Sequence, residues 1–460
     1  MIELTKEKGK NVGIFGLART GISSYEALLP FANLVCFDDK ESNRIDFAKK
    51  FTDKDLKSID DQAWTKLDYI IFSPGVPLRF PKPHPLVDIA HHHKIPLISD
   101  IELLYRANPN AKYVAITGTN GKSTTTALIG HIMGGQFGVG GNIGASALSL
   151  EQKDGYVLEM SSYQLDLLHK MKPNVSVLLN ITPDHIDRHG SLNGYIEAKK
   201  RIWRNMGKGD SLVIGVDNDI TRSIYDELKG KVAFDLVPIS AHDMIPDLPY
   251  NKSLLGLHNR ENIAAGYAVA RILGKSHEEI LIRVATFGGL AHRMQFVGAI
   301  ALPPSCLTRR SPKVLGSSPK GLFEGSTISF YNDSKATNAE AASKSLASLE
   351  NIYWLAGGVP KEGGIESLAP LFDRIKKAYL FGQAKNQFAK TLGGKVDYVI
   401  CETMEEAFGL AANDARASGS PANVLLAPAC ASFDQFESFE HRGDKFIELY
   451  QSHLIIKQII

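Results

Sequence analysis

The segment with the clearest chemical potential is 117–124, which reads Thr-Gly-Thr-Asn-Gly-Lys-Ser-Thr. It lies between an apolar, strand-like run at 113–116 and an apolar, helix-like segment. A glycine-rich turn in that position points backbone N–H groups at an anion, as in nucleotide-binding phosphate loops. Lys122 would add a positive charge beside the β- and γ-phosphates, and the Ser123 hydroxyl could bind Mg²⁺. Because Ile116 stands where the strict motif has its first glycine, a chance glycine-rich turn is the alternative.

Two further polar residues follow strand-like runs downstream of this loop. Glu159 ends the run 156–159, and His185 lies in the segment 180–189, directly after another apolar run. Open α/β sheets bind ligands at the carboxyl ends of their strands, so both side chains could reach a nucleotide and its Mg²⁺. A surface glutamate and an ordinary loop histidine are the alternatives.

The elements that must position these groups alternate between strand and helix patterns along the chain. This alternation predicts an α/β fold with parallel sheets. Since 460 residues exceed the usual size of one domain, we expect three domains. They are a domain at 1–101 that begins like a doubly wound, Rossmann-like sheet, a central domain at 102–291 that carries the glycine-rich loop on a parallel sheet, and an α/β domain at 292–460. The strand-like runs are 11–16, 34–37, 69–72 and 96–99 in the first, 113–116, 155–160 and 175–180 in the second, and 352–356, 378–381 and 424–427 in the third.

Composition excludes several classes of partner. The 52 Lys and Arg nearly balance the 50 Asp and Glu, so the chain has no general field for nucleic acid or an anionic membrane. Its 4 cysteines are widely spaced, which is typical of a reducing compartment. With neither a secretory signal nor an apolar run long enough to cross a bilayer, the sequence predicts a cytoplasmic protein.

Eight short motifs make nearly the whole chain resemble the Mur ligases of peptidoglycan synthesis, in particular the branch that adds D-glutamate. They are T-G-T-N-G-K-S-T-T (117–125), G-G-N-I-G (140–144), L-E-M-S-S-Y-Q-L (158–165), D-H-I-D-R-H (184–189), G-x-H-N-x-x-N (256–262), H-R (292–293), N-D-S-K-A-T-N (332–338) and A-C-A-S-F-D-Q-F (429–436). The resemblance implies that a Rossmann-like first domain holds a UDP sugar, that a central domain like a phosphate-loop ATPase holds ATP, and that a Rossmann-like third domain holds an amino acid.

The resemblance also implies a reaction. ATP would phosphorylate the carboxylate of UDP-N-acetylmuramoyl-L-alanine, and the amine of D-glutamate would then displace phosphate from the acyl phosphate. The cofactors would be ATP and Mg²⁺, and the product would serve cell-wall synthesis, cell shape and cell division. We expect a monomer that works on small molecules and contacts neither nucleic acid nor membrane.

The resemblance assigns roles residue by residue. Lys122, His185 and Lys199 would be catalytic, with Lys199 carbamylated, although the sequence alone favours an exposed helix lysine beside Lys200. The metal ligands would be Ser123, Glu159, His185 and carbamylated Lys199. The ATP-binding residues would be Gly118, Thr119, Asn120, Gly121, Lys122, Ser123, Thr124, Asn259, Asn262, Arg293 and Asp333. The UDP-sugar-binding residues would be Arg19, Thr20, Asp39, Lys40, Asn142 and His185. The D-glutamate-binding residues would be Thr337, Lys361, Ser432 and Phe439.

Other interpretations stay open. The segment 13–21 resembles a dinucleotide fingerprint, with Asp38 near the position of a ribose carboxylate, so an NAD-dependent oxidoreductase is one alternative. Another Mur-type ligase, a ligase like folylpolyglutamate synthetase and a non-catalytic nucleotide-binding protein are the others. The segment 302–326 departs from the family and predicts a basic insertion, for which a tolerated surface loop is the alternative. The three histidines at 91–93 are expected at an exposed helix end, without a role.

Overall fold

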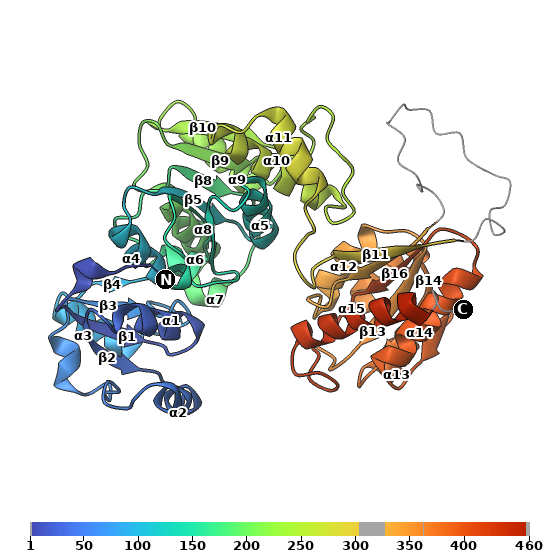
Figure 1. Ribbon diagram of the computed structural model, residues 1–460, viewed down its shortest axis with the longest axis horizontal. Helices are drawn as coiled ribbons and strands as arrows, with labels where there is room; N and C mark the ends of the chain where they lie inside the picture. The colour runs from blue at the N-terminus through green and yellow to red at the C-terminus, as the bar shows by residue number, and fades with distance from the viewer. Residues whose placement is uncertain (1, 303–326, 362, 457–460) are drawn as a thin grey trace. The chain divides into compact units, whose positions relative to one another are not determined.

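The computed structural model describes residues 2–302, 327–361 and 363–456, and the strands within these ranges form three sheets (Figure 1). Helices are interspersed with the strands in all three regions, which confirms the predicted α/β class. The insertion predicted at 302–326 lies, apart from Leu302, outside the described residues.

The first sheet has the strand order β2-β1-β3-β4, and its strands pair in parallel. Phosphate-binding Rossmann-type sheets share this strand–turn–helix start, here from β1 into α1. The strands are β1 (Asn11–Phe15), β2 (Asn33–Phe37), β3 (Tyr69–Phe72) and β4 (Leu97–Ile98). The helices are α1 (Arg19–Leu28), α2 (Glu41–Lys50), α3 (Pro85–His92) and α4 (Asp100–Ala107). The histidines at 91–93 are exposed at the end of α3, as expected.

The second sheet is parallel and has the order β10-β9-β8-β5-β7-β6. Its central strands are mostly apolar because both faces are covered: Tyr113 and Ala115 belong to one buried cluster, and Val114 and Ile116 belong to another. The strands are β5 (Lys112–Thr117), β6 (Gly138–Gly141), β7 (Gly155–Glu159), β8 (Val175–Leu178), β9 (Ser211–Gly215) and β10 (Asp235–Ile239). The helices are α5 (Lys122–Ile132), α6 (Ser162–Leu165), α7 (Ile186–His189), α8 (Leu192–Lys200), α9 (Asp219–Leu228), α10 (Leu257–Ile272) and α11 (His277–Ala285).

The third sheet has the order β11-β12-β16-β13-β14-β15, and only the edge strand β11 pairs antiparallel among its described strands. Alternate residues of β13 face opposite clusters, with Trp354 in one and Leu355 in the other. The strands are β11 (Gln295–Ala301), β12 (Thr327–Asn332), β13 (Ile352–Gly357), β14 (Ile375–Phe381), β15 (Tyr398–Ile400) and β16 (Ala422–Leu426). The helices are α12 (Ala339–Ala347), α13 (Lys385–Leu392), α14 (Met404–Ala417) and α15 (Phe439–Ile456).

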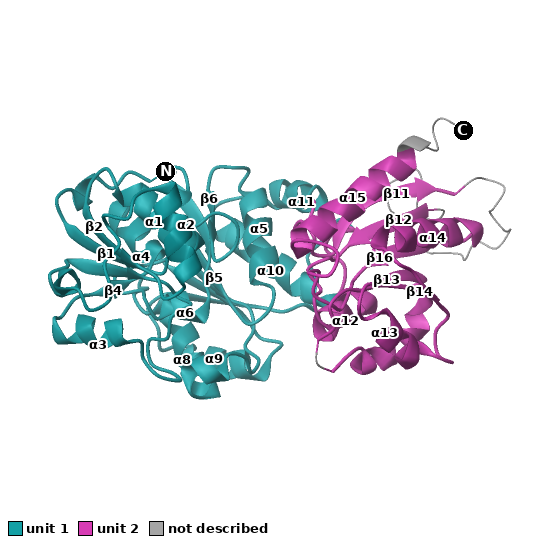
Figure 2. Ribbon diagram, turned by 90° about the horizontal axis from the view of Figure 1, so that it is seen from below, with its two compact units in different colours: residues 1–250, 257–287 teal, residues 251–256, 288–460 magenta. Residues whose placement is uncertain are grey.

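The chain divides into two compact units (Figure 2). Unit 1 comprises Met1–Tyr250 and Leu257–Phe287, and unit 2 comprises Asn251–Gly256 and Gly288–Ile460. Unit 1 contains the first and second sheets, and one buried cluster includes residues from both of them, such as Val12 and Tyr156. The division into three domains, at 1–101, 102–291 and 292–460, therefore stays a prediction. Among the described helices, none is both long and apolar enough to cross a membrane.

Candidate active site

The predicted phosphate loop connects β5 to α5, as the sequence indicated. Gly121 precedes α5 in the left-handed region (φ 84°), and a Cβ atom there would lie 2.4 Å from Asn262 Oδ1, so glycine is required. The amino-terminal end of α5 carries the positive end of the helix dipole, which suits an anion. Lys122 Nζ folds back over the loop and donates hydrogen bonds to the carbonyl oxygens of Gly118 (3.0 Å) and Thr119 (2.8 Å).

The structure narrows the set of loop amides that can hold a phosphate. The amides of Thr119 and Asn120 donate to Asn180, to its carbonyl oxygen (2.8 Å) and its Oδ1 (2.9 Å) respectively. These two N–H groups are thus turned toward the segment after β8. The predicted anion-binding role is then best served by the positive end of α5, at Lys122 and Ser123.

Glu159, at the end of β7, has the properties of a metal ligand. Its side chain is buried, at 2% exposure, so the alternative of a surface glutamate is wrong. Oε1 accepts a hydrogen bond from Asn142 Nδ2 (2.9 Å), whereas Oε2 is buried without a hydrogen-bond partner among the described residues. A buried carboxylate oxygen without a partner is costly, and a bound cation would satisfy it. The residues present therefore fit Mg²⁺ at Glu159 and the neighbouring loop.

Lys199, on α8, is buried rather than exposed. Only 1% of the residue is accessible, so the exposed-lysine interpretation is wrong. Its Nζ donates to the carbonyl oxygen of Gly118 (2.7 Å) and to Thr117 Oγ1 (3.4 Å) and lies over the Tyr195 ring. Burial, and then the positive charge of Lys122, hold the pKa of Lys199 well below its usual value. A neutral amine is the form that can react with CO₂, which suits the predicted carbamate.

His185 lies in the loop before α7 and has a positive φ of 52°. Its side chain is about half exposed, with Nε2 3.5 Å from Asp184 Oδ2, and its ring lies against the rings of Tyr163 and Tyr195. No group of three or more His, Cys, Asp and Glu side chains within the described ranges could hold a metal alone. A Mg²⁺ ion here would therefore need oxygen ligands from its substrates as well.

Four of the residues predicted to bind the UDP sugar lie around the start of α1 and the turn after β2: Arg19, Thr20, Asp39 and Lys40. Arg19 is exposed and donates to the carbonyl oxygens of Gly144 (2.8 Å) and Asn142 (3.1 Å), so it links α1 to the loop that also supplies Asn142. Asp39 pairs with His84 (3.3 Å). Thr20 is half-buried at the start of α1, and Lys40 is exposed beside Asp39.

Asp38 has a structural task. Its buried carboxylate accepts hydrogen bonds from the backbone amides of Leu17 (2.6 Å) and Lys40 (2.8 Å) and from Asn43 Nδ2 (2.9 Å). It thereby ties the turn after β2 to the turn after β1. A carboxylate engaged in this way is poorly placed to bind a ribose, which removes support from the dinucleotide interpretation.

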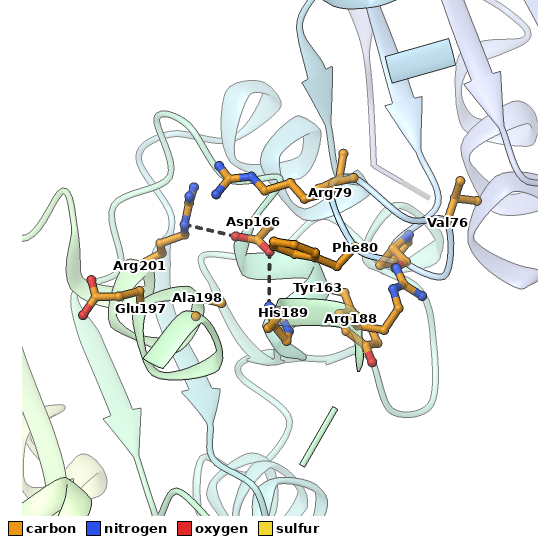
Figure 3. Close-up of a pocket in the computed structure, with 13 residues that line it drawn as sticks. Val76, Arg79, Phe80, Tyr163, Asp166, Arg188, His189, Glu197, Ala198 and Arg201 are labelled. Carbon is orange, nitrogen blue, oxygen red and sulfur yellow. Dashed lines mark hydrogen bonds and ion pairs between the residues drawn. The ribbon is translucent and has the colours of Figure 1, made fainter. Parts of the chain in front are cut away.

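A small cavity of about 100 Å³ adjoins α7 and α8 (Figure 3). Phe80, from the loop after β3, forms part of its wall, and Asp166 lies between His189 (3.8 Å) and Arg201 (3.1 Å). Burial lowers the pKa of His189, whose Nε2 also lies 2.9 Å from Ser162 Oγ. Drug-sized ligands occupy cavities of about 300 Å³ or more, so this space is too small for a sugar nucleotide.

Arg188 lines the same cavity and holds the loop after β3 in place through hydrogen bonds. Its guanidinium donates to the carbonyl oxygens of Gly75 (2.8 Å) and Pro74 (3.4 Å) and lies 4.6 Å from the centre of the Tyr163 ring. The sequence contained it within the D-H-I-D-R-H motif, but nothing in its spacing indicated this contact with a segment 113 residues earlier.

Asn259 and Asn262 are buried on α10 and connect that helix to α5. Thr125 Oγ1 donates to Asn262 Oδ1 (3.1 Å), and Asn262 Nδ2 donates to Asn259 Oδ1 (2.9 Å). Their predicted contact with adenine stays a prediction, since both amides already take part in the packing of α10 on α5, the helix that follows the phosphate loop.

In unit 2, most of the predicted residues lie close to the ends of neighbouring strands. Arg293 and Asp333 lie beside the β11–β12 edge, and the segments that carry Lys361 and Ser432 are joined by paired backbone hydrogen bonds between Val359 and Ala431 (2.9 and 3.1 Å). Thr337 is half-buried shortly after β12, and Phe439 begins α15 with its ring under Lys335 Nζ (3.7 Å).

Asp333 is buried rather than open to solvent. Its carboxylate accepts hydrogen bonds from the amide of Met294 (3.2 Å) and from Ser345 Oγ. Desolvation raises its pKa to about 6. The structure thus places it beside the 292–294 segment, and its predicted contact with ribose stays untested.

Arg442, which sequence analysis missed, organises this part of unit 2. It is fully buried and donates to Ser334 Oγ (2.9 Å) and to the carbonyl oxygens of Ser334 (2.9 Å) and Cys430 (3.1 Å). Burial lowers its pKa to about 10. It holds the N-D-S-K and A-C-A-S segments together, although its place on α15 gave no indication of that in the sequence.

Comparison with known proteins decides the family. Residues 116–243 match the model of the Mur ligase middle domain. The chain is 46% identical to UDP-N-acetylmuramoylalanine--D-glutamate ligase of Rickettsia prowazekii, over 97% of this chain and 99% of the relative. The enzyme of the same name from Caulobacter vibrioides is 43% identical, over 97% and 96%. The chain belongs to the Mur ligase family.

Solved structures of Mur ligases share the fold. UDP-N-acetylmuramate-alanine ligase MurC of Thermotoga maritima aligns with a TM-score of 0.55 at 15% identity, covering 96% of this chain and 100% of that chain. MurF of Acinetobacter baumannii aligns with a TM-score of 0.52 at 18% identity, covering 75% and 79%. At these identities the likeness concerns architecture alone, and it agrees with the predicted α/β fold.

Proposed function

We propose that this Mur ligase joins D-glutamate to UDP-N-acetylmuramoyl-L-alanine with consumption of ATP, through an acyl phosphate. The proposal takes its substrates from the names of relatives that match nearly the full chain. It also includes a cytoplasmic, monomeric enzyme of cell-wall synthesis. The observation that carries the chemistry is the convergence of Lys122 and Lys199 on one carbonyl oxygen, that of Gly118.

This convergence suits phosphoryl transfer from ATP. The start of α5 would hold the phosphates through its backbone amides, and Lys122 would leave the loop carbonyls to neutralise the γ-phosphoryl group. Glu159, Ser123 and a carbamate on Lys199 would hold Mg²⁺, and His185 would serve the ion nearer the substrate carboxylate. When bound, Mg²⁺ would neutralise charge that develops on the phosphoryl oxygens.

The carboxylate must be activated because a carboxylate anion reacts poorly with an amine, and phosphorylation supplies a leaving group. A carboxylate oxygen of the muramoyl-alanine attacks the γ-phosphorus, and the bond from γ-phosphorus to the bridging oxygen of ADP breaks. The amine of D-glutamate then attacks the acyl carbon, and phosphate leaves with the former carboxylate oxygen. The residues gathered after β12, β13 and β16 in unit 2, including Lys361 and Ser432, would hold the two carboxylates of D-glutamate.

Phosphate release from ATP tests this function. The purified chain is supplied with UDP-N-acetylmuramoyl-L-alanine and, one at a time, D-glutamate, L-glutamate, L-lysine, meso-diaminopimelate or L-alanine. We expect release, with amide product, only with D-glutamate. Release with another amino acid would identify another Mur-type ligase, and release with a folate and glutamate but not with the UDP sugar would identify a folylpolyglutamate synthetase. Nucleotide binding without turnover on any set would contradict the ligase.

A further inference from the structure

Asn180, in the segment that follows β8, holds the phosphate loop through hydrogen bonds. Its backbone carbonyl oxygen accepts a hydrogen bond from the backbone N–H of Thr119, and its side-chain Oδ1 accepts one from the backbone N–H of Asn120. Its Nδ2 lies 3.4 Å from the carbonyl oxygen of Asn120. A single side chain thus meets both backbone polar groups of Asn120. None of the roles assigned above uses Asn180.

The amide of Asn180 is oriented by a second residue, Glu261 on α10. Asn180 Nδ2 donates to Glu261 Oε2 at 3.1 Å. The other end of the amide must present its oxygen, because the backbone N–H of Asn120 can only donate. Glu261 accepts a hydrogen bond from the NH₂ of the Asn180 amide, and the backbone N–H of Asn120 donates one to its oxygen. Both contacts therefore require the same orientation of the Asn180 side chain.

We propose that Asn180 and Glu261 form a positioning pair that holds the phosphate loop in its ATP-binding shape. With Thr119 and Asn120 turned inward onto Asn180, the loop's remaining amides face the nucleotide from the start of α5. Rotation of the Asn180 amide would set its NH₂ group against the amide of Asn120 and release the loop. The inference rests on the proposed ATP site and adds two residues to it.

The surroundings of Glu261 support a fixed side chain rather than a mobile one. The Oε1 atom would lie 2.5 Å from a Cβ atom at Gly215, so the absence of a side chain at the last residue of β9 makes room for the carboxylate. Burial raises the pKa of Glu261 to about 7. The hydrogen bond from Asn180 lowers this pKa, and the charge of Asp217 raises it. Either protonation state keeps an oxygen that can accept from Asn180.

The test exchanges donor and acceptor across the pair. Asn180→Asp keeps an oxygen that accepts from the backbone N–H of Asn120, but it places a carboxylate against the carboxylate of Glu261. Glu261→Leu removes the oxygen that accepts from Asn180 Nδ2. We expect each to raise the Kd and KM for ATP about tenfold, the scale of one charge-assisted hydrogen bond, with little change in the KM of the other substrates. Glu261→Gln keeps an acceptor and should stay within about twofold of the wild type.

The double variant Asn180→Asp with Glu261→Gln restores a donor facing an acceptor. It should therefore recover most of the ATP affinity that Asn180→Asp loses. In the single variant Asn180→Asp, lowering the pH from 8 to 6 should also recover affinity, because protonation of either carboxyl group removes the repulsion. Glu151→Gln, at an exposed glutamate 82% accessible, is the matched control and should change nothing.

The results separate this inference from the proposed function. If Glu261→Leu folds with wild-type ATP affinity, or if the double variant binds ATP no better than Asn180→Asp, the positioning role is wrong. If Glu261→Leu fails to fold, the comparison of Asn180→Asp with the double variant still decides. If the wild type binds ATP but releases no phosphate with the proposed substrates, the function is wrong, whereas the Kd series continues to test the pair.

Discussion

Lys199 Nζ donates a 2.7 Å hydrogen bond to the carbonyl oxygen of Gly118, so α8 delivers a buried amine directly to the phosphate loop. Lys122 Nζ contacts the same oxygen at 3.0 Å. Burial penalises the charged form of Lys199 and lowers its pKa, and the positive charge of Lys122 beside it lowers the pKa further. The amine of Lys199 is thereby prepared for reaction with CO₂.

We predict that Lys199 forms a carbamate. Incubation with ¹³CO₂ should give a carbamate resonance in NMR spectra of the wild type, and Lys199→Ala should lack it. Degassed enzyme should lose activity and regain it when bicarbonate is added. Lys200→Ala is the control, because Lys200 is ion-paired with Glu227 and Glu197. A resonance that persists in Lys199→Ala would place the carbamate elsewhere.

The lowered pKa of Lys199 also predicts how stability depends on pH in CO₂-free buffer. Below pH 10.5 the unfolded lysine is protonated, whereas the folded one resists protonation until its lowered pKa is reached. The unfolded state then binds more protons, so this residue costs stability as the pH falls through that window. Lys199→Met should remove this cost, and its melting temperature relative to the wild type should rise from pH 10 to pH 7. A constant difference would contradict the lowered pKa.

Glu159→Gln should weaken the use of Mg²⁺. The substitution replaces the buried, unpartnered Oε2 by a group that can turn an NH₂ toward the metal, while the shape is kept. We expect the Mg²⁺ concentration at half-maximal rate to rise at least about tenfold and kcat to fall about 100-fold, as for loss of a metal ligand. Glu151→Gln is again the control. An unchanged Mg²⁺ requirement in Glu159→Gln would exclude Glu159 as a ligand.

Arg188→Lys should impair the UDP-sugar site, because the loop after β3 that Arg188 holds leaves the same edge of the parallel first sheet as the turns after β1 and β2. A lysine cannot donate to Gly75 and Pro74 together while it stacks on Tyr163. We expect the KM for UDP-N-acetylmuramoyl-L-alanine to rise about fivefold to tenfold, with the KM for ATP unchanged. Arg222→Lys, at an exposed arginine of α9, is the control. If instead the KM for ATP rises, Arg188 acts on the phosphate loop.

Much of the fold could be predicted from the sequence because parallel strands buried on both faces are continuous apolar runs. This is why 113–116 and 175–180 stand out, while β6 does not: its sequence Gly-Val-Gly-Gly has a single apolar side chain. The edge strand β10 is only partly buried and begins with Asp235, so its pattern is weak as well.

The site could be predicted best where all the groups that the chemistry needs are close together in one segment. The loop around Lys122 is such a segment, since turn, charge and hydroxyl are adjacent in the chain. Lys199 and Glu159 are buried by other segments of the chain, and the neighbouring Lys200 favoured the interpretation of Lys199 as an exposed helix lysine. Asn180 and Glu261 are 81 residues apart, and no local pattern predicts their hydrogen bond.

The most direct test of the central claim follows oxygen from substrate to phosphate. UDP-N-acetylmuramoyl-L-alanine labelled with ¹⁸O in its terminal carboxylate is turned over with ATP and D-glutamate, and the inorganic phosphate is analysed by mass spectrometry. The acyl-phosphate account predicts one ¹⁸O atom in each phosphate formed from fully labelled substrate. Unlabelled phosphate, formed together with the amide product, would contradict it.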